Sequence, residues 1–224
     1  MPAKRSIHNK NYRLNVMNFV LKWVILVIIV ITLGICLEIL FMVRGAYVKT
    51  FSIDNLYHGM EVNSWINKNM NYIDSIYDLY NNVTKNKEIT IKLLHTCLMK
   101  QLPVNFIFAL VKQESMFNPN ARNVNNNKSV DCGLFQLNSL VYKKYIDAGG
   151  IQYLFDIENN ITFGTEHILE AYKDTKDWYA ALGVYNRGSV YSNVNNYYLS
   201  NIVKYEQTLD DLFNVFVNSI GGKK

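Results

Sequence analysis

Glu114 is the residue of this sequence whose type and position best suit acid–base chemistry. It follows an apolar stretch of helical spacing, residues 102–111, and Asn118-Pro119 ends the helix soon after it. A carboxylate on the last helical turn faces the negative end of the helix dipole and has little solvation, so we expect its pKa to be raised. Such a group can act as a general acid. A lone glutamate at a helix end is more often a surface residue, so the neighbouring residues must decide.

Two short segments around Glu114 carry residue types that suit a sugar ligand. The first reads Glu114-Ser115-x-Phe117-Asn118-Pro119-x-Ala121. The second reads Gly133-Leu134-Phe135-Gln136-Leu137-Asn138. A glycine lets the backbone approach a ligand closely, and Gln136 offers a donor and an acceptor to a sugar amide. The second segment alone is weak evidence, because Gly-Leu-x-Gln also occurs by chance.

Three further features lie later in the chain. Asn160-Ile161-x-x-Gly164 opens a helix that continues to about residue 172. The next helix ends in Ala181-Leu182-Gly183-Val184-Tyr185-Asn186-Arg187-Gly188. An aromatic side chain beside an asparagine suits a sugar ring, although Gly188 is equally consistent with a helix C-cap. The last feature is Tyr198, near the start of an apolar helical repeat over residues 196–219.

Together these segments resemble the soluble lytic transglycosylase (SLT) family, goose-lysozyme-like enzymes that cut peptidoglycan. The resemblance covers roughly residues 88–205. The Asn-x-Asn-x-x-Lys-Ser-Val-Asp-x-Gly spacing before the second segment is most similar to the small transglycosylases of envelope-spanning secretion machines. Two positions depart from the family pattern: Phe135 stands for the usual Met, and Val184 for an Ala.

The resemblance implies a mainly α, lysozyme-like (goose-type) domain with Glu114 as the catalytic acid. It implies that Asn160 is structural and that a tyrosine hydroxyl at position 198 reaches Glu114, although Tyr197 is adjacent and the register could be off by one. Neither a cofactor nor a metal is expected. The residues expected to bind substrate are Ser115, Gly133, Phe135, Gln136, Tyr185, Asn186 and Tyr198.

The mechanism implied by the resemblance needs a single acid. Most glycosidases use two carboxylates. The nearest second one in sequence is Asp131, which the resemblance assigns to the motif before Gly133 without a catalytic role. Glu114 would cleave the β-1,4 bond between N-acetylmuramic acid and N-acetylglucosamine and leave a 1,6-anhydro ring. A muramidase (hydrolase) on the same fold and a non-catalytic glycan-binding scaffold are the alternatives.

The N-terminal part of the sequence predicts a membrane anchor. Residues 19–43 are apolar except for Lys22 and Glu38, and a helix needs about 20 residues to cross the hydrocarbon layer. Five positive charges up to Lys22 favour a cytoplasmic N-terminus and export of the remainder. A cleaved signal peptide is the main alternative, but no small-x-small cleavage site follows the run. We therefore expect a single-pass inner-membrane protein with its catalytic domain in the periplasm.

The domain organisation follows from these assignments. An amphipathic helix is predicted from Val62 to Tyr80, and its partner is expected to be the long last helix. The predicted parts are a cytoplasmic tail 1–17, a transmembrane signal-anchor helix 18–43, a stalk 44–87, an SLT domain 88–205 and a C-terminal helical extension 206–224.

Composition excludes several classes of function. The net charge of +5 arises before residue 38, and the remaining chain is neutral, so no nucleic-acid footprint is present. Expected partners are peptidoglycan glycan strands, the inner membrane and an envelope-spanning secretion or motility complex. The cysteine and histidine spacings match no zinc or redox motif. We expect Cys97 and Cys132 to be buried free thiols; a disulfide between them is the alternative.

Overall fold

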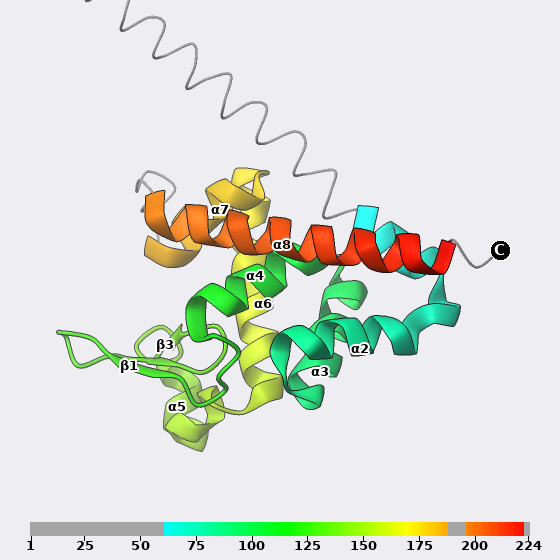
Figure 1. Cartoon of the computed structure of the whole chain (residues 1–224). Helices are drawn as coiled ribbons and strands as arrows, with labels where there is room; N and C mark the ends of the chain where they lie inside the picture. Colours follow the sequence, from blue (N-terminus) through cyan, green and yellow to red (C-terminus); the bar gives the residue numbers. More distant parts are fainter. Residues whose placement is uncertain (1–60, 188–195, 222–224) are drawn as a thin grey trace, which may run out of the picture. The chain divides into compact units, whose positions relative to one another are not determined.

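The computed structural model describes residues 61–187 and 196–221. All of them belong to one compact unit, Ser52–Lys224. This part of the chain is mainly helical, as the sequence predicts, with one small sheet (Figure 1). After a helical stretch at residues 61–68 come η1 (Met70–Tyr72), α2 (Ile73–Thr84), α3 (Lys87–Lys100), α4 (Val104–Ser115), β1 (Arg122–Val124), β2 (Val130–Cys132), β3 (Leu137–Asn138), α5 (Lys143–Gly149), η2 (Ile151–Leu154), α6 (Ile157–Thr175), α7 (Trp178–Arg187) and α8 (Asn196–Gly221).

Helix α4 lies at the centre of the core. Every residue from Val104 to Val111 is buried, because α8 runs across one side of the helix and α3 packs on it as well (Figure 1). Pro103 is its N-cap residue and does not lie in its first turn. The helix ends at Ser115, earlier than the predicted stop at Asn118-Pro119. The reason is that Met116 and Phe117 adopt left-handed backbone angles, with φ of 56° and 61°.

The Asn-rich stretch after α4 forms a hairpin. Strands β1, β2 and β3 are antiparallel in the order β1-β2-β3, with Asn123 opposite Asp131 and Asp131 opposite Asn138. The Asp131 carboxylate accepts hydrogen bonds from the side-chain amides of Asn123, Asn125 and Asn138, at 3.2, 2.9 and 2.7 Å. These three hydrogen bonds satisfy the Asp131 carboxylate, so Asp131 has a structural role in the sheet.

The predicted continuous helix over residues 62–80 is wrong, because the chain breaks at Asn69. The backbone N–H of Asn69 donates to the carbonyl of Ile66, and the side-chain amide of Asn69 donates to the carbonyl of Trp65 at 2.8 Å. These bonds satisfy carbonyls at the end of the first helical stretch. The chain then restarts as η1 and α2.

The predicted packing of this N-terminal segment on the last helix is confirmed. The Trp65 ring meets the rings of Phe213 and Phe216 on α8, with centroids 5.5 and 6.0 Å apart. The Asn63 side chain also bridges the α3–α4 connection, donating to Leu102 O at 2.7 Å and accepting from Val104 N at 3.2 Å. From residue 61 onward the predicted stalk therefore packs on the core. The extent 88–205 for the SLT domain stays a prediction.

Helices α3 and α7 flank the core. The buried face of α3 is formed by Ile89, Leu93, Leu94 and Cys97, whereas Ile91 is 39% exposed. Asp177 caps α7 by accepting a hydrogen bond from Ala180 N at 2.8 Å.

The remaining predictions concern the cysteines and the anchor. Cys97 and Cys132 are free and buried, as expected. Within residues 61–187 and 196–221, no helix is both long and apolar enough to cross a membrane. The predicted anchor at 18–43 lies outside the described residues.

Candidate active site

Glu114 lies in the last turn of α4 and is half-buried. Its Oε1 atom accepts a hydrogen bond from the hydroxyl of Tyr198 on α8. Burial raises the pKa of Glu114 to about 7, the Tyr198 bond lowers it, and the negative charge of Asp131 raises it. The direction agrees with the sequence argument. A carboxyl group with this pKa is protonated in a large fraction of molecules at neutral pH, as a general acid must be.

Tyr198, and not Tyr197, faces Glu114. Tyr198 is buried, whereas Tyr197 is 72% exposed. Burial and the charge of Glu114 raise the pKa of Tyr198 far above its usual range, so its hydroxyl stays protonated and donates. The side chain of Asn186 also hydrogen bonds to Tyr198 and lowers this pKa. The predicted contact between residue 198 and Glu114 is thus present, and α4, α7 and α8 each supply one member of the group.

Tyr185 connects α7 to the loop after β2. Its hydroxyl donates to the backbone carbonyl of Phe135 at 2.6 Å. Burial raises the pKa of Tyr185, and the charge of nearby Glu114 adds to the increase. One residue further along α7, Asn186 is exposed. Tyr185 therefore borders the Glu114 site with its hydroxyl already bonded, and the exposed Asn186 is open to a ligand.

Asn160 has the structural role predicted for it. Its Oδ1 accepts from the backbone N–H of Phe135 at 2.8 Å, and its Nδ2 donates to the carbonyls of Cys132 and Leu154 at 2.9 and 2.6 Å. Gly133 has φ of +72°, and a Cβ atom there would lie 2.4 Å from Asn160 Nδ2. The close backbone approach at Gly133 thus serves packing against Asn160, and its predicted contact with substrate stays a prediction.

Phe135 packs beneath the loop that it belongs to. Its side chain is 1% exposed and fills the space over Gly164, where a Cβ atom would come within 2.1 Å of the ring. The backbone carbonyl of Phe135 accepts the Tyr185 hydrogen bond. Its predicted contact with substrate stays a prediction.

Ser115 and Gln136 make internal bonds. The buried Ser115 hydroxyl donates to Val111 O at 3.1 Å within α4, and its predicted contact with substrate stays a prediction. Gln136 has φ of +48°, and its Nε2 donates to the carbonyls of Gly133 and Ala121 at 2.9 and 3.2 Å. The amide donors of Gln136 are thus used by the protein, and only its carbonyl oxygen remains for a sugar.

His167 supports the site and was missed by the sequence analysis. It lies on α6, where its ring meets the Tyr185 ring edge-on at 5.0 Å and its Nδ1 lies 3.4 Å from the Tyr142 hydroxyl. Burial lowers the pKa of His167, so the ring is neutral at pH 7. The sequence signal that could have identified His167 was its position one helical turn after Gly164.

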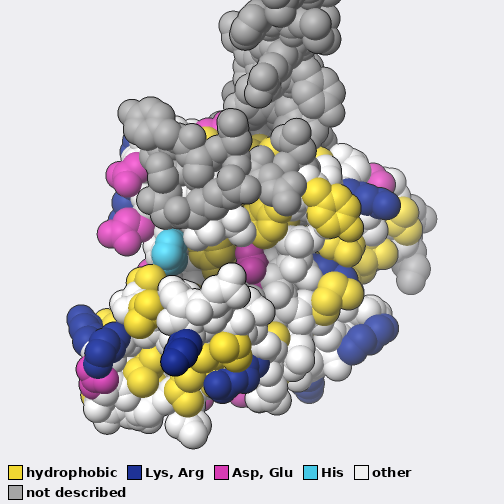
Figure 2. All heavy atoms as spheres, turned by 90° about the vertical axis from the view of Figure 1, so that its left-hand side faces the viewer, with side chains coloured by type: hydrophobic (Ala, Val, Ile, Leu, Met, Phe, Trp, Pro, Cys, Tyr) yellow, Lys and Arg dark blue, Asp and Glu magenta, His cyan; other side chains and the backbone are white. Residues whose placement is uncertain are grey.

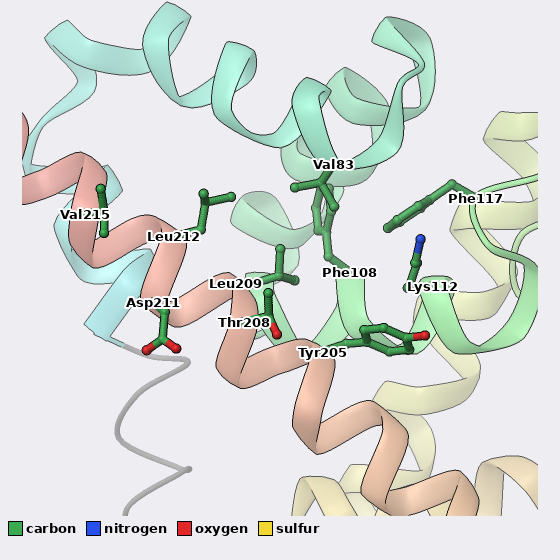
Figure 3. Close-up of a pocket in the computed structure, with 10 residues that line it drawn as sticks. All are labelled: Val83, Phe108, Lys112, Phe117, Tyr205, Thr208, Leu209, Asp211, Leu212 and Val215. Carbon is green, nitrogen blue, oxygen red and sulfur yellow. The ribbon is translucent and has the colours of Figure 1, made fainter.

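The molecular surface is hollowed on the face that carries the sheet. Figure 2 shows acidic and hydrophobic side chains at the floor of this hollow. A separate apolar groove of about 500 Å³ lies between α2, α4 and α8 (Figure 3). Its lining includes Phe108, Lys112, Phe117 and Leu209. It does not include Glu114, Tyr185 or Tyr198. Among the described residues, no cluster of His, Cys, Asp and Glu could hold a metal ion.

The model of one protein family, the transglycosylase SLT domain, matches residues 95–201. This stretch begins inside α3, ends inside α8 and contains Glu114, Tyr185 and Tyr198. Residues 95–201 thus match the transglycosylase SLT domain family, as the motifs in this lysozyme-like helical region predicted. No curated protein and no solved structure matches the chain.

Proposed function

We propose that this protein is a membrane-anchored lytic transglycosylase that cleaves peptidoglycan. The observation that carries the proposal is the state of Glu114: its pKa is raised to about 7 by burial, and Tyr198 holds one of its oxygens. The carboxyl group is therefore protonated often enough to donate, and its orientation is fixed. The family match supplies the substrate class, since SLT domains act on peptidoglycan.

In the proposed first step, neutral Glu114 gives its proton to the β-1,4 bridging oxygen between N-acetylmuramic acid and N-acetylglucosamine. The bond from that oxygen to the muramic acid C1 breaks, and the oxygen of the substrate's own acetamido group stabilises the cationic centre. Glu114 is now a carboxylate and still accepts the Tyr198 hydrogen bond, which favours its charged form.

In the second step, the Glu114 carboxylate takes the proton of the muramic acid 6-hydroxyl. The oxygen of that hydroxyl bonds to C1 and closes the 1,6-anhydro ring. Glu114 is protonated again and no water is consumed. Asp131, the nearest carboxylate in sequence, accepts bonds from three asparagine amides, which favours a mechanism with a single acid.

We further propose that residues 18–43 anchor the protein in the inner membrane with the catalytic domain in the periplasm, where its substrate is. The support is the length of the apolar run and the five positive charges up to Lys22. An envelope-spanning complex as partner rests on the sequence resemblance of residues 123–133 alone.

The test is digestion of purified peptidoglycan by a fragment of residues 52–224, followed by mass spectrometry of the products. Anhydro ends are one water lighter than reducing ends. We expect anhydro ends from the wild type and a loss of about a hundredfold or more in Glu114→Gln, because the amide keeps the size but carries no acidic proton. Activity of Glu114→Gln within about tenfold of wild type would contradict the assignment of Glu114 as the catalytic acid. Reducing ends alone would make the protein a muramidase, and glycan binding without cleavage would make it a scaffold.

A further inference from the structure

A second buried carboxyl group lies on α8, away from Glu114. Glu206 is 5% exposed, and its Oε2 accepts a hydrogen bond from the hydroxyl of Tyr179 at 2.6 Å. Within the part of the chain that the structure describes, no lysine or arginine forms an ion pair with Glu206. Glu206 follows Tyr198 by about two helical turns, or about 12 Å along the axis. It therefore cannot reach a substrate held at Glu114, and its function must lie elsewhere.

The Tyr179–Glu206 bond lies where three helices meet. Tyr179 belongs to the first turn of α7, and its ring contacts the ring of Phe106 on α4 edge-on at 5.9 Å. One turn beyond Glu206, Asp210 accepts a bond from Asn105 of α4 at 2.7 Å, and Asn105 accepts one from Tyr80 of α2 at 2.5 Å. Buried polar bonds thus tie α8 to α7 at one position and to α4 at the next.

Between the described residues of α7 and α8, side-chain hydrogen bonds are present at two positions. Tyr179 in the first turn of α7 bonds to Glu206, and Asn186 in its last turn bonds to Tyr198. The earlier residue of α7 pairs with the later residue of α8, so the helices run antiparallel. Helix α7 packs on α6, whereas α8 packs on α4. The two bonds therefore link one helix layer to the other.

We propose that Glu206 is a positioning residue for Glu114: by accepting the Tyr179 hydrogen bond, it fixes α8 against α7 so that Tyr198 and Asn186 meet at the catalytic carboxyl group. This rests on the proposed function of Glu114. A single bond between two helices leaves them free to pivot, whereas two bonds a few turns apart set both their distance and their register. A shift of Tyr198 by about 1 Å is enough to cost on the order of a hundredfold in rate.

The protonated form of Glu206 performs this role. Burial raises the pKa of Glu206 to about 8; the hydrogen bond from Tyr179 lowers it, and the charge of Asp210 raises it. The titratable groups around the junction are Tyr179 of α7, the α7 cap residue Asp177, Asp210 of α8 itself and Tyr80 of α2. None of them is basic, so within this set only the Tyr179 hydrogen bond favours a charged Glu206. Burial also keeps Tyr179 protonated and able to donate, because its pKa lies far above the usual range.

The test uses Tyr179→Phe in the full-length protein, with peptidoglycan as substrate. Removing the donor frees α8, so we expect kcat to fall about tenfold with little change in KM. We also expect the alkaline limb of kcat/KM to move to higher pH, because the Tyr198 bond lowers the pKa of Glu114 and would be weakened. Glu206→Gln keeps a neutral acceptor and should behave as wild type at pH 6. Tyr205→Phe, which removes a hydroxyl next to Glu206 in the chain, is the matched control and should change nothing.

A double-mutant cycle separates positioning from general stability. If Tyr179 and Glu206 act through Tyr198, adding Tyr179→Phe to Tyr198→Phe should cost little more than Tyr198→Phe alone. Additive losses, or a lower melting temperature with an unmoved alkaline limb, would overturn the proposal. A ¹³C-carboxyl NMR titration of Glu114 in the full-length variants, in detergent micelles, gives a second readout that needs no turnover. A wild type without anhydro products would refute the lytic transglycosylase assignment, while the Glu114 titration would still decide the positioning role.

Discussion

At the scale of single residues, Glu114 is governed by opposing influences on its pKa. Burial and the charge of Asp131 raise the pKa, while the Tyr198 hydrogen bond lowers it, and the result is about 7. The proposed first step requires the protonated form, so its population falls as the pH rises through this value. We expect kcat/KM to decline above pH 7, about tenfold per pH unit. Initial rates of anhydro-product release between pH 5 and 9 measure this, and a rate that is flat up to pH 9 would contradict it.

The neighbouring tyrosines give a sharper test of the same site. Tyr198→Phe removes the donor to Glu114 and should lower kcat roughly ten- to a hundredfold with little change in melting temperature. Tyr197→Phe should do much less, because its side chain is 72% exposed and points about 100° away around the helix. Measuring both variants on the same muropeptides compares the two directly. Greater damage from Tyr197→Phe, or none from either, would show that the Tyr198 contact is not used in catalysis.

At this scale the sequence predicted contacts between motif residues, but it did not predict which way each side chain points. The contact of Glu114 with Tyr198 and the structural role of Asn160 are confirmed. The side chains of Ser115 and Phe135 point into the protein, and their predicted contacts with substrate stay predictions. A motif gives residue types at fixed spacing, but which side of a tight turn a side chain faces depends on backbone angles that these types do not determine.

At the scale of helices and strands, apolar periodicity located the elements better than their faces or ends. Residues 104–111 of α4 are all buried because the helix is central, so apolar spacing there does not distinguish a buried face from an exposed one. In α3, Ile91 is as apolar as Ile89 and Leu93, yet the fold exposes Ile91 and buries the other two. The break at Asn69 was missed, since the apolar spacing continues through it and only the local amide bonds reveal it.

The N-terminal helices lead to a prediction about truncation. Ile66, Ile76 and Tyr80 are fully or almost fully buried, and each contributes roughly 1.5–3 kcal/mol of burial free energy. Their sum is comparable with the total stability of a typical domain, about 5–15 kcal/mol. A fragment of residues 88–224, which starts at the predicted domain boundary, should therefore lose cooperative thermal unfolding. The fragment of residues 52–224 should keep it.

Circular dichroism melts of the two fragments at equal concentration provide the measurement. Trp65→Ala in the longer fragment is a graded control, because it removes only the ring contacts to Phe213 and Phe216 and should lower the melting temperature without abolishing the transition. Equal melting temperatures for both fragments would show that residues 52–87 contribute nothing to the fold.

At the scale of the whole chain, charge and hydrophobicity are divided unevenly. All of the excess positive charge lies at or before Lys22, next to the apolar run of residues 19–43, and the remaining chain is neutral. In residues 61–187 and 196–221 no helix can span a membrane, so the evidence for an anchor comes from this N-terminal run. We propose that the anchor determines where the protein is located. The remaining chain, which includes the catalytic domain, carries no net charge.

The corresponding prediction concerns topology. A reporter that is active only outside the cytoplasm should give signal when fused after Lys49 and none when fused after Lys10, because the positive residues before the run keep the N-terminus inside. The full-length protein should also stay in the membrane fraction after a high-salt wash, since burial of about 20 apolar residues does not depend on ionic contacts. Replacing Lys4, Arg5, Lys10 and Arg13 by neutral residues should weaken the orientation and reduce the signal after Lys49. A mature N-terminus found at Cys36 or beyond would instead identify the run as a cleaved signal, and the enzyme would then reach peptidoglycan without a transmembrane anchor.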